Sequence, residues 1–166
     1  MTIPSRLVLA SGLLLLAGCS ASPDNLAEEH LSFIQTGNVS EAREQYCVLG
    51  ESLRLHDVRD FEIVSTTTKS RDGFDFTEIV ANVDTSQFKL IDPGTGPQQI
   101  PIRQVTIEVW DSDDFYEGLV LSTARFNELS QRNESITGMP AEPLDTPGRE
   151  AVNPSKLCAF LPFEQF

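Results

Sequence analysis

The sequence predicts one α+β domain, because helical and strand-like hydrophobic patterns occupy separate parts of the chain. Apolar residues recur at helical spacing from residue 26 to residue 49, and the pattern changes to alternation at Phe61. Helical spacing returns after Tyr116. We therefore expect an N-terminal helix pair, a curved antiparallel β-meander, a packing helix and a C-terminal segment held by a disulfide.

The helix pair is predicted from its caps and stripes. Ser22 can cap the free N–H groups of the first helix, Pro23 suits its first position, and Gly37 suits its end. A second helix is predicted from a Ser40 cap, with Cys47 near its end. The apolar stripes are Leu26, Ala27, His30, Leu31 and Ile34 in the first helix and Val39, Ala42, Tyr46 and Leu49 in the second.

Three neighbouring strands joined by short turns are predicted in the middle of the chain. They cover residues 61–68, 74–90 and 100–110. Arg71-Asp72-Gly73 is typical of a hairpin, and residues 92–97 form a second turn. The alternation changes phase within the second strand, which predicts a bulge there, and it changes phase again in the third.

The last third of the chain predicts a helix, a long loop and an apolar tail. Asp114 and Glu117 have the spacing of a capping box, so a helix is expected to begin there and to end near Arg132. Residues 133–155 are rich in proline and glycine and predict an irregular loop. Residues 157–163 form an apolar segment that Cys158 could fasten to the second helix.

The N-terminus has the features of an export signal. Residues 1–18 carry one basic residue and then an apolar run too short to span a bilayer, which needs about 20 residues. Leu16-Ala17-Gly18-Cys19 resembles the bacterial lipobox. The resemblance implies that residues 1–18 are removed and that Cys19 is lipidated, while the alternative is an ordinary signal with a free cysteine. Two or three acyl chains would anchor the protein firmly in a membrane.

These features divide the chain into a signal peptide (1–18), a lipidated cysteine with a short linker (19–22) and one domain (23–166). The expected location is the cell envelope, outside the cytoplasm. Ser20 follows the cysteine where enteric lipoproteins of the inner membrane carry Asp, and this resemblance favours the outer membrane.

The composition excludes one class of partner and predicts one covalent bond. The formal charge is −13, so the domain should repel phosphate backbones and anionic headgroups, and nucleic acid is not an expected partner. With Cys19 lipidated, Cys47 and Cys158 remain in an oxidising compartment, where they are expected to form a disulfide. The alternative is two buried free thiols.

The helix pair also carries a family resemblance. Residues 30–38, Glu41-Ala42-Arg43 and Tyr46-Cys47 are similar to the opening helices of bacterial lipoproteins with cystatin-like or NTF2-like folds. The resemblance implies a bent antiparallel sheet after the helices. It also implies a mostly noncatalytic family, and it supplies no site residues.

The candidate chemical groups have structural explanations. Asp111, Asp113, Asp114 and Glu117 do not follow a calcium-loop pattern and are explained as caps of a helix start. His30 lies on an apolar stripe and is expected in the core. His56 and Asp57 are the candidates for a general base and its partner. No catalytic, cofactor-binding or metal-binding residue is otherwise expected, because the chain carries none of the common catalytic motifs.

The leading hypothesis is therefore a noncatalytic binding or accessory module of the envelope, tethered through Cys19. It would bind an envelope protein or a small ligand on the concave sheet face or through residues 133–155, a segment whose length is typical of either a functional or a disordered loop. One alternative is a small-molecule enzyme with an NTF2-like pocket, in which His56 would face a cavity. The other is a purely structural envelope protein.

Overall fold

The computed structural model describes residues 22–91, 93–94, 96–140 and 142–162. The predicted signal peptide and the lipidation of Cys19 lie outside these residues and stay predictions. Among the helices within the described ranges, none is long and apolar enough to cross a membrane.

The first helix, α1 (Pro23–Thr36), confirms the prediction at both ends. The Ser22 hydroxyl accepts a hydrogen bond from the Asn25 N–H at 3.3 Å. Gly37 ends the helix with φ 78°, a left-handed conformation that glycine adopts without strain. The predicted stripe is buried, including His30, except for Leu26, which is partly buried.

The second helix, α2 (Val39–Glu44), is shorter than predicted. Its N-cap is Asn38 rather than Ser40, and the predicted stripe through Tyr46 and Leu49 is wrong. Tyr46 instead pairs in parallel with Ala159, and the Cys47 N–H donates to the Ala159 carbonyl at 2.9 Å. The backbone leaves the helix because a strand from the other end of the chain satisfies its hydrogen bonds.

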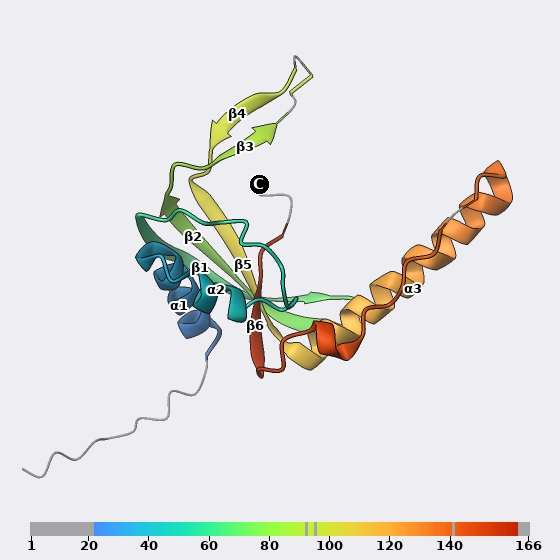
Figure 1. Cartoon of the computed structure of the whole chain (residues 1–166), viewed down its shortest axis with the longest axis horizontal. Coiled ribbons are helices and arrows are strands. Elements are labelled where there is room, and N and C mark those ends of the chain that lie inside the picture. The colour runs from blue at the N-terminus through green and yellow to red at the C-terminus, as the bar shows by residue number, and fades with distance from the viewer. Residues whose placement is uncertain (1–21, 92, 95, 141, 163–166) are drawn as a thin grey trace, which may run out of the picture.

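A four-stranded antiparallel sheet forms the centre of the molecule, in the order β1-β2-β5-β6 (Figure 1). The strands are β1 (Asp60–Arg71), β2 (Phe74–Asp84), β5 (Gln104–Asp111) and β6 (Leu157–Phe160). The predicted hairpin is confirmed, because Asp72 and Gly73 connect β1 to β2 with positive φ. The predicted meander is confirmed as β1-β2-β5, and the C-terminal segment adds a fourth strand.

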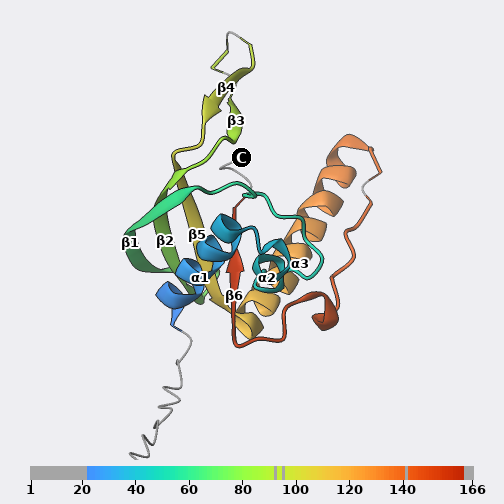
Figure 2. The same ribbon diagram turned by 60° about the vertical axis from the view of Figure 1, so that its left-hand side comes forward.

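The second and third predicted strands, residues 74–90 and 100–110, are each interrupted, although the sequence predicts them as continuous. Residues 85–87 separate β2 from β3 (Phe88–Ile91), and residues 102–103 separate β4 (Gln98–Pro101) from β5. β3 and β4 form a separate two-stranded hairpin that extends beyond the sheet (Figure 2). At the first break the Ser86 N–H donates to the Asp57 carboxylate at 2.9 Å, so a side chain replaces the strand ladder.

The predicted bulge in the second strand is wrong. The register of β2 is continuous with β5, and the bulge lies in β1, between Ile63 and Ser65. The change of phase in β2 has another cause: Ile79 is buried in the cluster beneath α1, whereas Phe76 is buried in a second cluster on the other face. A strand that is buried first on one face and then on the other changes phase without a bulge.

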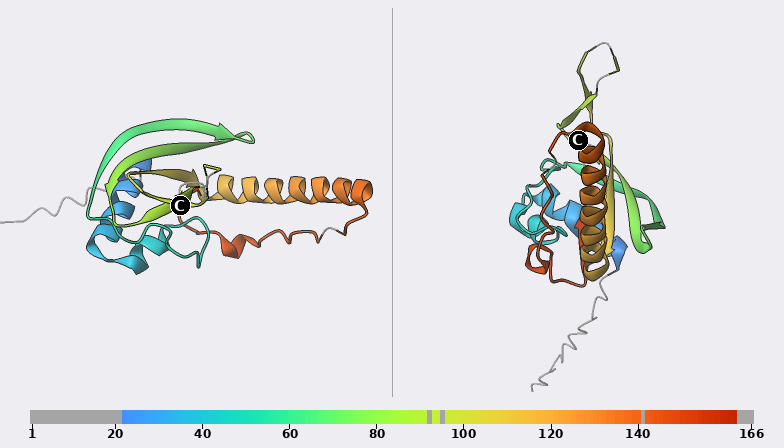
Figure 3. Two further views of the ribbon diagram at one scale, coloured as in Figure 1. Left: turned by 90° about the horizontal axis from the view of Figure 1, so that it is seen from above. Right: turned by 90° about the vertical axis from the view of Figure 1, so that its right-hand side faces the viewer.

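The third helix, α3 (Ser112–Thr137), begins earlier and ends later than predicted. Its N-cap is Asp111, which accepts a hydrogen bond from the Asp113 N–H at 3.0 Å, so the predicted capping box does not start it. Gly138 ends it, with φ 69°. The predicted loop therefore begins at residue 138. It runs back beside α3 and includes the short 3-10 helix η1 (Arg149–Ala151), as Figure 3 shows.

Two hydrophobic clusters hold the fold together, one on each face of the sheet. The larger lies between α1 and the sheet. The smaller lies on the opposite face, where α3 begins, and it contains the Cys47–Cys158 disulfide. The predicted disulfide is therefore present, but it joins β6 to the segment after α2 rather than to a helix. The main buried members of the smaller cluster are Cys47, Phe76, Trp110 and Cys158.

Candidate ligand-binding site

The candidate site lies on the sheet face that α1 does not cover. On β5, Val105, Ile107 and Val109 belong to the cluster beneath α1. Because successive strand residues point to opposite faces, the residues between them face the other way. Gln104, Thr106, Glu108 and Trp110 therefore share the open face.

Charged side chains on this face are paired across the strands. Glu78 of β2 lies directly opposite Glu108 of β5, an arrangement of like charges that would be unfavourable by itself. β1 supplies a cation to each: Lys69 Nζ lies 2.7 Å from the Glu78 carboxylate, and the Arg71 guanidinium binds both oxygens of Glu108 at 3.0 and 2.6 Å. The acids are thus held in place by their neighbours on the hairpin.

The Arg71–Glu108 pair is the best-supported polar contact of the site. The Glu108 side chain is only 3% exposed, and it also accepts a hydrogen bond from Trp110 Nε1 at 3.1 Å. The Arg71 guanidinium lies 5.0 Å from the centre of the Phe76 ring and 5.7 Å from that of Trp110, within the range of cation–π attraction. A bidentate pair stacked on aromatic rings fixes the orientation of the arginine.

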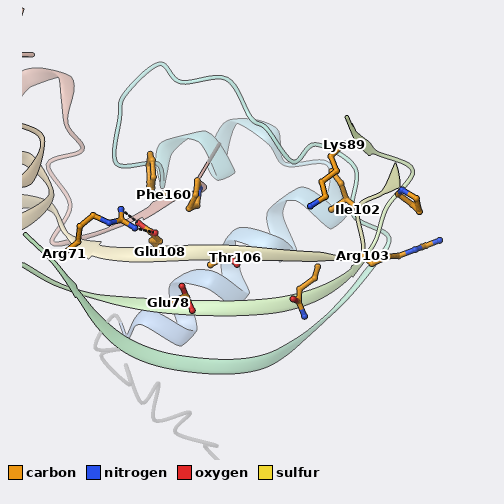
Figure 4. A pocket seen from close by; sticks show the side chains of 11 residues that line it. Arg71, Glu78, Lys89, Ile102, Arg103, Thr106, Glu108 and Phe160 are labelled. Carbon is orange, nitrogen blue, oxygen red and sulfur yellow. Dashed lines mark hydrogen bonds and ion pairs between the residues drawn. The ribbon is translucent and has the colours of Figure 1, made fainter. Parts of the chain in front are cut away.

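A wide hollow of about 940 Å³ lies along this face, which we call the sheet hollow. Figure 4 shows Arg71 and Glu108 at one end and Lys89 of β3 at the other. Its charged lining residues are three cations and two acids: Arg71, Lys89, Arg103, Glu78 and Glu108. Cations outnumber acids here although the whole chain has a charge of −13.

A narrower pocket of about 230 Å³ adjoins the sheet hollow, and we call it the aromatic pocket. Arg71 and Phe160 line both spaces, so the two meet at these residues. The remaining lining residues of the aromatic pocket come mostly from β5 and the first turns of α3; they are Val48, Asp72, Trp110, Phe115, Gly118, Leu119 and Ser122.

Stacked rings form the wall of the aromatic pocket. The Phe76 and Trp110 rings stack with centroids 4.4 Å apart, and Phe115 lies edge-on to Trp110 at 5.9 Å. Phe115 in turn contacts Phe160 at 5.6 Å. Phe160 lies two residues after the disulfide at Cys158, so the bond that fastens β6 also positions one wall of the pocket.

His56 and Asp57, the candidates for a general base and its partner, lie elsewhere. His56 is exposed, and its backbone N–H donates to the Gln87 side chain at 2.8 Å. The Asp57 carboxylate accepts hydrogen bonds from the Ser86 hydroxyl and the Ser86 N–H, and these bonds lower its pKa. Neither residue lines the sheet hollow or the aromatic pocket. Both therefore organise the loop at the end of β2.

His30 lies in the core, as predicted. It is fully buried on the inner face of α1, its Nδ1 lies 3.1 Å from Gln45 Oε1, and its ring contacts Tyr46 with centroids 5.2 Å apart. Burial disfavours the charged imidazolium and lowers the pKa of His30 to about 4, although the hydrogen bond with Gln45 acts in the opposite direction. His30 is thus a neutral core residue near pH 7.

The acidic cluster at the start of α3 has structural contacts. Asp111 caps the helix, and Asp113 forms an ion pair with Arg149 at 2.8 Å. Among the residues that the structure describes, no group of three or more His, Cys, Asp or Glu side chains has the geometry of a metal site.

The residues that form the site were not singled out from the sequence. One signal was available: Glu108 interrupts a run of β-branched and aromatic residues in a predicted strand, where an acid needs a partner. That partner, Arg71, lies in the predicted hairpin turn, and only the fold brings the two together. No protein-family model, curated protein or solved structure matches this chain.

Proposed function

We propose that this chain is an exported, lipid-anchored protein of the bacterial cell envelope whose domain is a noncatalytic binding module. Its ligand would place an apolar group in the aromatic pocket and a polar, anionic body along the sheet hollow. The observation that carries this proposal is the continuity of the two spaces at Arg71 and Phe160. The helix pair and curved sheet are also compatible with the cystatin-like or NTF2-like resemblance.

The aromatic pocket supplies the favourable free energy for an apolar group. Its walls are mainly the rings of Trp110, Phe115 and Phe160. A ring or branched side chain fully buried there would gain about 1.5–3 kcal/mol from removal of apolar surface from water. The volume of about 230 Å³ suits one such group, so the rest of an extended ligand would lie outside the pocket.

The cations of the sheet hollow would orient the ligand by attracting its anionic group. Lys89 lies over its far end and has no ion pair with any described residue within 4 Å, whereas Arg103 is near Asp84 at 3.8 Å. An anionic group of a ligand would therefore be attracted to the sheet hollow, although most of the surface repels it.

The proposal of a noncatalytic role rests on how the acids are used. Both oxygens of Glu108 accept hydrogen bonds from Arg71, and one also accepts from Trp110. Glu78 is paired with Lys69. A general base needs a lone pair directed at its substrate. These carboxylates direct theirs at neighbouring cations, which favours a binding surface.

The binding proposal can be tested with the single tryptophan of the chain. Trp110 lines the aromatic pocket, so its fluorescence should change saturably when 4-phenylbutyrate is added. The neutral 4-phenylbutanamide should bind more weakly, because it lacks the anionic group.

Two substitutions at Gly118 form the matched control. A Cβ at this position would lie 3.7 Å from the Phe74 ring, an ordinary contact, so Gly118→Ala should retain the response. Gly118→Leu should abolish it by filling the aromatic pocket. An equal response from the two variants at unchanged thermal stability would contradict binding in this pocket.

The anchor is tested separately. Replacing Cys19 by Ser should abolish metabolic labelling with palmitate and leave uncleaved precursor, because the thiol carries the lipid. Normal labelling of this variant would overturn the lipid anchor but would leave the binding proposal intact.

A further inference from the structure

The second half of α3 forms an arm that projects away from the sheet, as Figures 1 and 3 show. We define the arm as residues 122–140 and 142–148. The chain returns along the helix, where the Asn127 side chain donates to the Leu144 carbonyl at 2.9 Å and accepts from the Leu144 N–H at 2.8 Å. The arm is thus a helix with one side held by its own return segment.

A line of side chains on the arm follows the spacing of a coiled coil, and we call it the seam. Its residues are Ser122, Phe126, Leu129, Asn133 and Ile136, separated alternately by four and three positions. This is the d-a-d-a-d pattern of a heptad repeat. Phe126, Leu129 and Ile136 are 49%, 64% and 82% exposed. A folded chain that leaves three large apolar residues in line on one helix presents an interaction surface.

The return segment leaves the seam open. The side of the helix with reduced exposure contains Thr123, Asn127 and Ser130. At about 100° per residue, Thr123 and Ser130 flank one edge of the seam and Asn127 lies farther round the helix, while the seam residues themselves are exposed. The seam also runs for roughly 22 Å, at about 1.5 Å per residue, so a second helix could lie along it without displacing the return segment.

We propose that the seam binds the same seam of a second copy of this chain, as a parallel, in-register helix pair. In such a pair Asn133 faces its own counterpart, and an asparagine at an a position is best satisfied by an asparagine across the pair. The apolar positions Phe126, Leu129 and Ile136 would likewise meet their counterparts. In this symmetric pair, each Asn133 amide can donate a hydrogen bond to the Asn133 carbonyl oxygen of the other copy.

The charges on the arm also favour a second copy. Residues 122–137 contain two Arg and two Glu and have no net charge, whereas the whole chain has a charge of −13. Two acidic copies therefore meet with less repulsion along this helix than the charge of the whole chain would suggest. Beside the seam, Arg125 pairs with Asp72 and Arg132 pairs with Glu128, so both cations of the helix are already neutralised within their own chain.

Cysteine cross-linking tests the pairing in the full chain, in whichever cell fraction contains it, so the result does not depend on the lipid anchor. Two copies with different epitope tags are expressed together, each with Asn133→Cys, and oxidised with copper phenanthroline. A disulfide-linked product that carries both tags is expected, since a positions face each other in a parallel pair. The matched control is Gln131→Cys, which is also exposed but lies on the outer f position. It should form little of this product.

A second substitution tests the apolar contact. In the Asn133→Cys background, Leu129→Asp should reduce the cross-link by about tenfold or more, because pairing would bury a charge. Leu129 is exposed, so the fold and the Cys47–Cys158 disulfide should be unchanged. Equal cross-linking at positions 131 and 133, or a product of Asn133→Cys that contains another protein and only one tag, would overturn the proposal.

Discussion

The two faces of β5 differ although their residues alternate along one strand. Val105, Ile107 and Val109 are buried beneath α1 in a closed apolar cluster. On the opposite face, Thr106, Glu108 and Trp110 border open space, and a salt bridge and stacked rings hold the geometry. The comparison indicates that stability resides mainly on the closed face, while the open face keeps polar groups in fixed positions. This division suits a protein that presents a binding surface on a rigid sheet.

The largest effect should come from truncation on the closed face. Ile107→Ala should lower the free energy of unfolding by about 4 kcal/mol, because Ile107 is fully buried and its loss leaves a cavity. The matched control is the adjacent Thr106→Ala on the open face, which should change stability by less than about 1 kcal/mol. Urea unfolding measures both. Similar losses of unfolding free energy at the two positions would contradict the conclusion that stability resides mainly on the closed face.

The disulfide is the strongest stabilising contact expected on the open face. Replacing both Cys47 and Cys158 by Ala should cost about 3 to 4 kcal/mol, since the bond joins residues 111 positions apart. It should also weaken the response to 4-phenylbutyrate, because β6 carries Phe160 into the aromatic pocket. Reduction of the native protein should reproduce both effects. A stability unchanged by reduction would show that the apolar contacts alone fasten β6.

Acid should weaken the closed face through His30. The folded protein keeps His30 neutral down to its pKa of about 4, whereas the unfolded chain binds a proton at about 6.5. The unfolded state therefore binds more protons in this window, and stability falls by roughly 3 kcal/mol as the pH is lowered through it. The depressed pKa of Asp57 adds a further loss at lower pH, because its stabilisation is complete above the ordinary carboxyl pKa of 3.8 and is lost as the pH falls below that value.

A variant that lacks His30 isolates this contribution. His30→Phe should flatten the dependence of unfolding free energy on pH between about 6.5 and 4, while the loss due to Asp57, which lies below the ordinary carboxyl pKa of 3.8, remains. A variant with the same steep pH dependence as the native protein would show that His30 is not the responsible group.

The smallest effect is expected at the salt bridge of the open face. Arg71→Ala should cost about 2 kcal/mol, because it leaves the buried Glu108 carboxylate without its cation. The loss is smaller than for a fully buried pair, since half of the Arg71 side chain is in solvent. Adding Glu108→Gln should recover most of the loss in a double-mutant cycle. Additive losses would mean that the two residues act independently.

The sequence alone determined the features that depend on residues close together in the chain, such as helix ends and tight turns. Ser22 and Gly37 bound α1 as predicted, because caps act within one turn of the chain. Asp72 and Gly73 form the predicted hairpin, since they tolerate positive φ. With Cys19 assigned to the lipid, Cys47 and Cys158 had only each other as partners, and the structure joins them.

Features that depend on distant partners were decided only by the tertiary structure. Tyr46 leaves the predicted helix because β6 offers hydrogen bonds to that segment from more than 100 residues away. Ile79 is buried in the cluster beneath α1, whereas Phe76 is buried in the cluster on the opposite face. The change in the alternation of apolar residues along β2 therefore depends on which other elements cover each face, and the sequence of β2 alone does not show this. The same holds for the candidate site: Arg71 and Glu108 meet across a hairpin and a neighbouring strand. The sequence determines which charged side chains are present, while the register of the sheet determines that Arg71 and Glu108 lie close enough to pair.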